Sequence, residues 1–487
     1  MAEVVSAGRR VASGIAWILG VQLVTAIVQL SYAAFTSRHA DQTSFGQYAI
    51  ALSATALVSL IATSGLGAAA SRMSSTDEPE VRVLISLALL TGSAMALMLY
   101  LISNPWAKLW GNEGASPVIR LLAFGILVTP ATAVQLGVLR REARFRQFAI
   151  ASFLSSLVGM LVGAFFVLRQ PSAASLAVLN VASSWVLLLV GILYLGRRSL
   201  PTFSSSGAQQ HVSFGLKSLV TSLLIYAGVS APQIAISRSL STAVLGEWNR
   251  ASVLGQIPLE MLSSSVQRSI YPEFRDASRD PEAAARAWTV LVGVSALAIL
   301  PAVGILLPLL PSLVIGFFGP KWHLAGQMAG WILAATAINA VSGILSAAQE
   351  SAGVFRPTWI CSIVSGIALV STGVGTSISS LWQVAAVGIL VSVILGLLTQ
   401  LVVSSRANII TLSDVLRSLI LAVLLMCAAF ALSCYLYSAS HAVFLPALIG
   451  IPFAMAGSYV AIIKTVRFFP YVDFHIRLSR LIFRRTP

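Results

Sequence analysis

Apolar runs of about 20 residues recur along the whole chain, and they restrict its fold more than any other feature. A run of this length crosses a bilayer as an α-helix, because a helix bonds all of its backbone polar groups internally. The chain is 57% hydrophobic and only 10% charged, which is typical of a polytopic membrane protein. We therefore predict an all-α membrane protein with about fourteen transmembrane helices. The predicted spans are residues 12–36, 45–70, 83–103, 118–139, 147–168, 174–195, 214–236, 244–271, 287–309, 324–348, 357–378, 382–403, 413–436 and 441–463.

Positive charge is distributed unevenly between the predicted loops, and this asymmetry predicts the orientation. With the N-terminus in the cytoplasm, 24 of the 31 Lys and Arg residues fall on the cytoplasmic side. The positive-inside rule then explains the net charge of +15, and nucleic acid is not needed as a partner. Both termini are predicted to be cytoplasmic, with the first span retained rather than cleaved as a signal peptide. The other side receives Arg38, Lys108, Arg120, Arg169, Arg238, Arg250 and Lys321.

The segment 245–274 is apolar enough to span a bilayer, yet it carries a polar stripe. At 100° per residue its amide and acidic side chains share one helical face, with two arginines at the edge. Ionisable side chains facing lipid are costly, so this stripe is expected to face a water-filled cavity. The alternative is a helix packed inside a bundle with satisfied polar groups. Pro258 lies in the middle of the span and is expected to kink or break the helix there. The candidate substrate-binding residues of the stripe are Asn249, Arg250, Gln256, Glu260 and Arg268.

The first and seventh predicted spans repeat this pattern in weaker form. Each carries polar side chains on one helical arc, which indicates either a cavity-facing stripe or the polar contacts that join helices in a membrane. Three arginines near the outer ends of spans are further candidates, although each side chain is long enough to snorkel to the interface. These candidates are Gln22, Gln29, Tyr32, Tyr226 and Gln233 on the arcs, and Arg38, Arg120 and Arg238 at the span ends.

Two segments 200 residues apart share a pattern, which indicates an internal repeat. In each, an arginine is followed eight residues later by glycine and ten residues later by an aromatic residue. Because equal halves with a substrate site between them are a common transporter design, we predict two pseudo-symmetric lobes around a central cavity. The matching residues are Arg38, Gly46 and Tyr48 in one copy, and Arg238, Gly246 and Trp248 in the other. The expected divisions are an N-lobe at 1–195, a cytoplasmic connector at 196–213, a C-lobe at 214–403, two additional helices at 404–464 and a basic cytoplasmic tail at 465–487.

Sequence motifs for nucleotide and metal chemistry are absent. There is no phosphate-binding GxxxxGK[ST] loop, and the five histidines and three cysteines show no metal-ligand spacing. The carboxylates lie almost entirely in short loops, whereas a membrane-embedded glycan polymerase or ligase usually needs a large soluble loop that carries acids. We therefore expect a transporter rather than an enzyme, with no cofactor and no metal.

Five short motifs occur in a specific order along the chain. They are Arg38 with Phe45-Gly46-Gln47-Tyr48, then Trp248-Asn249-Arg250-Ala251, Gln256-Ile257-Pro258, Ser269-Ile270-Tyr271-Pro272-Glu273-Phe274 and Phe318-Gly319-Pro320-Lys321-Trp322. On these motifs the sequence resembles the polysaccharide exporter, or O-antigen flippase-like, family of the multidrug/oligosaccharidyl-lipid/polysaccharide (MOP) flippase superfamily. The resemblance spans nearly the whole chain, and it is strongest to the colanic-acid, teichuronic-acid and xanthan exporter group.

The resemblance implies a fold of twelve to fourteen helices in two lobes. It also implies that the protein moves undecaprenyl-diphosphate-linked oligosaccharides outward across the bacterial inner membrane by alternating access, alongside the polymerase and export machinery of a polysaccharide pathway. Two differences from other groups of transporters with this fold narrow the resemblance. Peptidoglycan-precursor flippases place arginines in the first span, whereas residues 11–36 contain none. Multidrug exporters often use an N-lobe carboxylate, and this N-lobe has none at membrane depth.

These observations favour a flippase for a lipid-linked, anionic glycan, because the expected path is polar and net positive. An inside-negative membrane potential assists the outward movement of an anion, so ATP is not required. A cation-coupled multidrug antiporter is the alternative, and it would use Glu260 as its deep carboxylate. A membrane-embedded glycan polymerase or ligase is a third hypothesis, against which the short loops argue.

Overall fold

The computed structural model describes most of the chain, and the described part contains helices and turns but no strand. Within that part, ten helices are long and apolar enough to cross a membrane, and each coincides with a predicted span. The prediction of an all-α membrane fold is thereby confirmed. The other four predicted spans, 12–36, 214–236, 244–271 and 441–463, extend into residues outside the description. The described residues are 20–21, 24–63, 78–202, 223, 226–256, 259, 281–351, 356–440, 449–450, 452 and 456–461.

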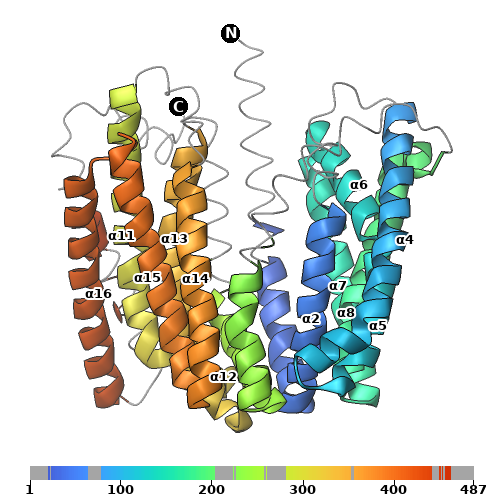
Figure 1. The fold of residues 1–487 in the computed structure, drawn as a ribbon, viewed down its shortest axis with the longest axis horizontal. Helices are drawn as coiled ribbons and strands as arrows, with labels where there is room; N and C mark the ends of the chain where they lie inside the picture. The colour runs from blue at the N-terminus through green and yellow to red at the C-terminus, as the bar shows by residue number, and fades with distance from the viewer. Residues whose placement is uncertain are drawn as a thin grey trace. The chain divides into compact units, whose positions relative to one another are not determined.

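The helices group into two compact units. Unit 1 contains Met1–Ile257, Val314–Met328 and Gly366–Ile389, and unit 2 contains Pro258–Leu313, Ala329–Ser365 and Leu390–Pro487. Three further helical segments comprise residues 24–39, 226–239 and 242–256. The labelled helices (Figure 1) are α2 (Gln42–Thr63), α4 (Glu78–Leu109), α5 (Ser116–Ile126), α6 (Thr129–Arg141), α7 (Phe145–Arg169), α8 (Ala173–Leu195), α11 (Pro281–Leu306), α12 (Leu310–Phe318), α13 (His323–Ser351), α14 (Arg356–Ser379), α15 (Trp382–Arg406) and α16 (Leu412–Ser440).

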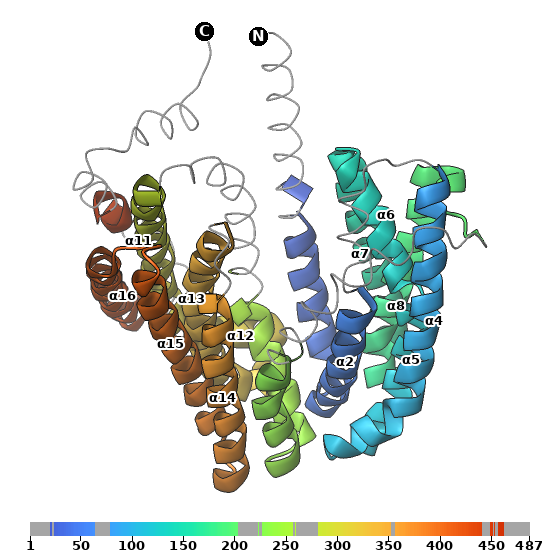
Figure 2. The ribbon, with the colours of Figure 1, turned by 45° about the horizontal axis from the view of Figure 1, so that its top comes forward.

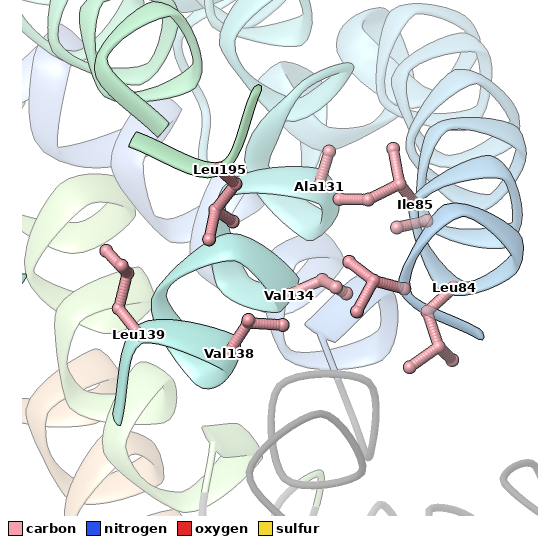
Figure 3. Close-up of a cluster of buried hydrophobic side chains, with 9 residues drawn as sticks. Leu84, Ile85, Ala131, Val134, Val138, Leu139 and Leu195 are labelled. Carbon is pink, nitrogen blue, oxygen red and sulfur yellow. The ribbon is translucent and has the colours of Figure 1, made fainter. Parts of the chain in front are cut away.

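Helices α4, α6 and α8 of unit 1 pack around a shared apolar core. In α4 the buried side chains recur at spacings of three and four residues, which places them on one helical face. Figure 3 shows Leu84 and Ile85 of this face beside Val134 and Val138 of α6, with Leu195 from the end of α8 nearby. Because lipid tails are as apolar as leucine, close packing stabilises this core more than the removal of apolar surface from water does.

The predicted span 118–139 is one membrane crossing made of two helices, α5 and α6. Pro130 has no backbone N–H, so the helical hydrogen-bond ladder cannot continue through this point. The break lies against Gly92 of α4, where an added Cβ would lie 2.1 Å from the carbonyl oxygen of Leu127. Beside the break, Thr129 Oγ1 donates a hydrogen bond to the carbonyl oxygen of Gly125 at 2.9 Å.

Helices α7 and α8 lie side by side in unit 1 (Figure 2). Their approach depends on a glycine, because a Cβ added at Gly159 would lie 1.9 Å from Ser183 Oγ. Small residues at such crossings let membrane helices pack closely. Helix α8 begins with a side-chain cap, in which Ser172 Oγ accepts a hydrogen bond from the backbone N–H of Ser175 at 3.3 Å.

Unit 2 contains α11 and α16 as close neighbours (Figure 1). A Cβ added at Gly304 of α11 would lie 2.4 Å from the carbonyl oxygen of Met426 of α16. Two turns later along α16, in the same unit, Ser433 Oγ donates to the carbonyl oxygen of Ile305 at 2.8 Å. These helices are therefore joined by a glycine contact and by a buried hydrogen bond.

A buried polar network joins α13, α14 and α15 in unit 2. Gln400 Nε2 donates to Ser346 Oγ at 2.8 Å and to Gln349 Oε1 at 3.2 Å. Thr358 Oγ1 donates to the same Gln349 oxygen at 2.6 Å. Because these groups satisfy one another and carry no charge, the network fits the interhelical polar contacts that stabilise membrane bundles.

Candidate functional site

The two copies of the sequence repeat meet in unit 1. The turns that end the 24–39 helix, α4, the 226–239 helix and α12 lie there, joined by hydrogen bonds that cross between the copies. We call this set the junction. It comprises residues 37–48, 110–112, 237–250 and 316–325.

Gly46 of α2 and Gly246 of the 242–256 helix mark the point where these helices cross. A Cβ added at Gly46 would lie 1.9 Å from the carbonyl oxygen of Thr242, and one added at Gly246 would lie 1.9 Å from that of Gln42. Residues 42 and 46 thus exchange equivalent contacts with residues 246 and 242. Reciprocal contacts of this kind are the mark of a two-fold axis. The crossing therefore relates the two copies by approximate two-fold symmetry.

On one side of the crossing, each copy places a cation on helix-terminal carbonyl groups of the other. Arg38 donates from Nη2 to the carbonyl oxygen of Gly316 at 2.9 Å and from Nε to that of Phe317 at 3.3 Å. Lys321 donates from Nζ to the carbonyl oxygen of Ala40 at 2.7 Å. The C-terminus of a helix carries unpaired carbonyls and partial negative charge, so a cation is favourable at both places.

The equivalence also extends to two tryptophans, both fully buried. Trp322 Nε1 donates to the carbonyl oxygen of Ser37 at 2.9 Å. Ser237, which is 200 residues after Ser37, donates from Oγ to the carbonyl oxygen of Trp110 at 2.7 Å. Each copy therefore uses a buried tryptophan of one half and a serine of the other, although the donor and acceptor roles are exchanged.

The second side of the junction is neutral where the first is charged. Asn112 Nδ2 donates to Thr242 Oγ1 at 2.8 Å, and Gln47 Nε2 donates to Asn112 Oδ1 at 3.4 Å. Arg238, the counterpart of Arg38, is exposed and packs its stem near Gly111. Gly111 has a φ of +75°, which glycine adopts without the strain that a side chain would add.

Arg250 is almost completely buried in the junction, with 6% of its surface exposed. Its guanidinium carbon lies 4.1 Å from the ring centre of Phe45 and 5.9 Å from that of Phe318, within the range of cation–π attraction. Nη2 donates to Asn249 Oδ1 at 2.9 Å, and Nη1 lies 3.5 Å from Ser37 Oγ. Within the described residues Nε has no hydrogen-bond partner. This cation is thus held by aromatic rings and neutral oxygens, with a donor left free.

Two tyrosines lie close enough to Arg250 to interact with its charge. The Tyr32 hydroxyl is buried and has no hydrogen-bond partner among the described residues. The Tyr48 hydroxyl accepts a hydrogen bond from Asn180 Nδ2 at 2.6 Å and keeps its own proton available to donate. The surroundings of Arg250 are therefore rich in hydrogen-bond donors, which suits an anionic group.

Glu247 is a buried carboxylate that sequence reasoning missed, with 5% of its surface exposed. Its Oε2 accepts a hydrogen bond from the backbone N–H of Ala325 at 2.8 Å, in the first turn of α13. Its Oε1 accepts one from Gln42 Nε2 at 3.4 Å. A carboxylate at a helix N-terminus is stabilised by the helix dipole. The sequence did contain a signal for Glu247: the first copy of the repeat has the amide Gln47 where the second copy has this carboxylate.

The remaining candidates lie at separate places. Arg120 donates from Nε to Ser103 Oγ at 3.0 Å and from Nη2 to Asn104 Oδ1 at 3.1 Å, so its side chain is bound to α4. Tyr226 donates its hydroxyl proton to the carbonyl oxygen of Ser53 in α2 at 2.6 Å. Gln29, Gln233 and Gln256 are half-buried.

The described residues cover the list of candidates only in part. Gln22, Glu260 and Arg268 lie outside them, as does the kink expected at Pro258. The structure thus brings Arg38, Tyr32, Arg238, Asn249 and Arg250 into or beside the junction. Within the described part of the chain, no three His, Cys, Asp or Glu side chains are grouped as metal ligands would be.

Comparison with known sequences places the chain among polysaccharide biosynthesis proteins, whose family pattern matches residues 37–326, more than half of the chain. The succinoglycan biosynthesis transport protein ExoT of Rhizobium meliloti is 25% identical over 59% of this chain and 58% of its own length. The teichuronic acid biosynthesis protein TuaB of Bacillus subtilis is 22% identical over 56% of each chain. The lipopolysaccharide biosynthesis protein WzxC of Escherichia coli is 22% identical over 59% of each. The chain therefore matches less than two thirds of the length of these relatives.

Solved structures with the same fold include two transporters. The lipid II flippase MurJ in an inward closed conformation superposes with a TM-score of 0.73, covering 95% of this chain and 99% of the other at 10% identity. An inward-facing multidrug resistance MATE family transporter of the MOP superfamily has a TM-score of 0.62, covering 80% and 98% at 14% identity. At such identities the likeness shows a shared fold. The chain is a multi-pass membrane protein that shares its fold with MurJ and with a MATE family transporter, and it belongs to the polysaccharide biosynthesis protein family.

Proposed function

We propose that the protein is a flippase. It moves an undecaprenyl-diphosphate-linked oligosaccharide repeat unit from the cytoplasmic to the periplasmic leaflet of the bacterial inner membrane, by alternating access, for surface or exopolysaccharide biosynthesis. Three relatives carry the names of succinoglycan, teichuronic acid and lipopolysaccharide biosynthesis, which supports the pathway. The shared fold with a flippase named for lipid II supports a lipid-linked cargo.

The observation that carries the proposal at residue level is the environment of Arg250. Its charge has no carboxylate partner among the described residues, and its Nε is free. Arginine binds phosphate or carboxylate through two parallel hydrogen bonds, which suits a diphosphate or an acidic sugar. Asn249 and Gln256, on the same helix, supply amides that suit sugar hydroxyls. On this proposal the other candidates, including Tyr32 and Arg38, line the path of the glycan.

The orientation we propose places both termini and the 196–213 connector in the cytoplasm, from the distribution of Lys and Arg. Outward movement of an anion is then assisted by the inside-negative membrane potential, by about 2.3 kcal/mol per charge per 100 mV. A diphosphate that crosses the whole field with two charges gains about 5 kcal/mol at 100 mV, so ATP is not required.

Loss of the protein from a polysaccharide-producing host tests this function. Lipid-linked repeat units should accumulate, and they should be protected from a glycan-degrading enzyme that is added from the periplasmic side of spheroplasts. The structural likeness to a MATE transporter favours a multidrug antiporter as the second candidate. In that case the lipid-linked pool would stay normal, and the cells would instead become sensitive to cationic drugs.

A further inference from the structure

Most contacts at the junction join the first repeat to the second. Ser37, Arg38 and Gln42 precede the connector in the sequence, whereas their partners Lys321 and Trp322 follow it. The same holds on the other side, where Asn112 contacts Thr242. A path between two repeats that opens at this end has to break these bonds and separate the glycine crossing.

We propose that the junction is a gate that closes one end of the transport path and is built twice, once around each repeat. The proposal rests on the transport function above, because a gate needs a path. Its geometric basis is a set of equivalent contacts, in which residues 37, 42 and 46 correspond to residues 237, 242 and 246, and Trp322 corresponds to Trp110. Gly46 with Thr242 corresponds to Gly246 with Gln42, and Ser37 with Trp322 corresponds to Ser237 with Trp110.

The two copies of the gate contribute unequally to closure. In the copy of the gate on the first side of the crossing, the donors are the cations of Arg38 and Lys321, which bind backbone carbonyls. In the other the contacts are neutral, between Asn112 and Thr242. Hydrogen bonds from ionised donors are stronger than neutral ones, so the charged copy is the main latch.

Arg250 links this gate to the substrate. Its guanidinium belongs to the second repeat, and it stacks on Phe45 and lies near Ser37, both of the first repeat. When the gate opens, Arg250 loses both of these neighbours. The same movement frees its donors for an anionic group. Opening the gate and presenting the arginine to an acidic cargo are therefore one event.

Trapping the gate shut tests the proposal in reconstituted full-length protein. Cys361, Cys427 and Cys434 are first replaced by alanine. The test variant then carries Asn112→Cys and Thr242→Cys, whose native side chains are bonded at 2.8 Å across the repeats. A matched control carries Ser365→Cys and Gly396→Cys within the second repeat, where a Cβ at Gly396 would lie 3.5 Å from Ser365 Cβ. Both are treated with the same short bifunctional methanethiosulfonate.

Crosslinking the test pair should lower transport of a lipid-linked oligosaccharide at least tenfold, and reductant should restore it. The control pair should keep transport within about twofold of the untreated protein. Transport at the untreated rate by fully crosslinked Asn112→Cys/Thr242→Cys protein would overturn the gate.

A second measurement needs no substrate, so it separates the gate from the proposed function. Ser37 is fully buried, and a membrane-impermeant thiol reagent should label Ser37→Cys slowly. Removing the charged latch with Lys321→Met should raise the labelling rate at least tenfold, whereas Thr242→Val should raise it less. If labelling responds in this way but no lipid-linked glycan is transported, the gate proposal is supported and the proposed cargo is wrong. Equal labelling in all three proteins would refute the gate.

Discussion

Adding one methyl group at the glycine crossing should weaken the junction. In Gly46→Ala the new Cβ would lie 1.9 Å from the carbonyl oxygen of Thr242, whereas ordinary contact begins at 3.4 Å. The two helices therefore have to separate by about 1.5 Å, the difference between these distances. Overpacking of this kind costs about 1–3 kcal/mol. That cost corresponds to a shift of about 5- to 150-fold from the closed toward the open gate.

The labelling rate of Ser37→Cys measures this shift in membranes that contain the full-length protein. Gly246→Ala should have a similar effect, because its added Cβ would meet the carbonyl oxygen of Gln42 at the same distance. Gly366→Ala is the matched control, because a Cβ there meets open space. If Gly46→Ala reaches normal membrane abundance but labels within twofold of its parent, the glycine contact does not set the closure of the junction.

Three further predictions concern the cargo, the orientation and the driving force. Arg250→Lys keeps the charge but loses the planar fork, so export normalised to membrane abundance should fall about tenfold or more, and Arg250→Ala should nearly abolish it; full activity in Arg250→Ala would remove this residue from the site. An impermeant thiol reagent added from outside should label Glu113→Cys and miss Gly207→Cys, and the reverse pattern would contradict the orientation. Transport by the purified protein should persist without ATP, and it should become faster when the compartment from which the cargo leaves is made electrically more negative. A strict need for ATP would contradict the absence of a nucleotide site.

The fold could be predicted from the sequence because membrane helices are recognised by the length and composition of their apolar runs. All ten described spans coincide with apolar runs, since a bilayer excludes other solutions for the backbone. The break between α5 and α6 is less visible, because Pro130 alone does not say whether a helix kinks or divides. It takes the packing of Gly92 against Leu127 to show that the chain divides there.

The junction was only partly accessible to sequence reasoning. The repeat around Gly46 and Gly246 predicts that two segments are equivalent, but a repeat does not say that its copies touch each other. The polar stripe selected Arg250, yet helical periodicity cannot distinguish a cavity from an aromatic cage made by residues far away in the chain. Glu247 was not predicted, because its partners Gln42 and Ala325 are far apart in the sequence and only the fold brings them to it.

Flipping of a lipid-linked oligosaccharide by the purified protein tests the central claim most directly. Vesicles would contain only the full-length protein and a fluorescent undecaprenyl-diphosphate oligosaccharide with an acidic sugar, without ATP and with an imposed diffusion potential. The account predicts that the labelled glycan becomes accessible to an added reductant on the opposite leaflet in vesicles with the native protein, and that Arg250→Ala vesicles behave like protein-free ones. Equal rates in native, Arg250→Ala and protein-free vesicles would contradict it.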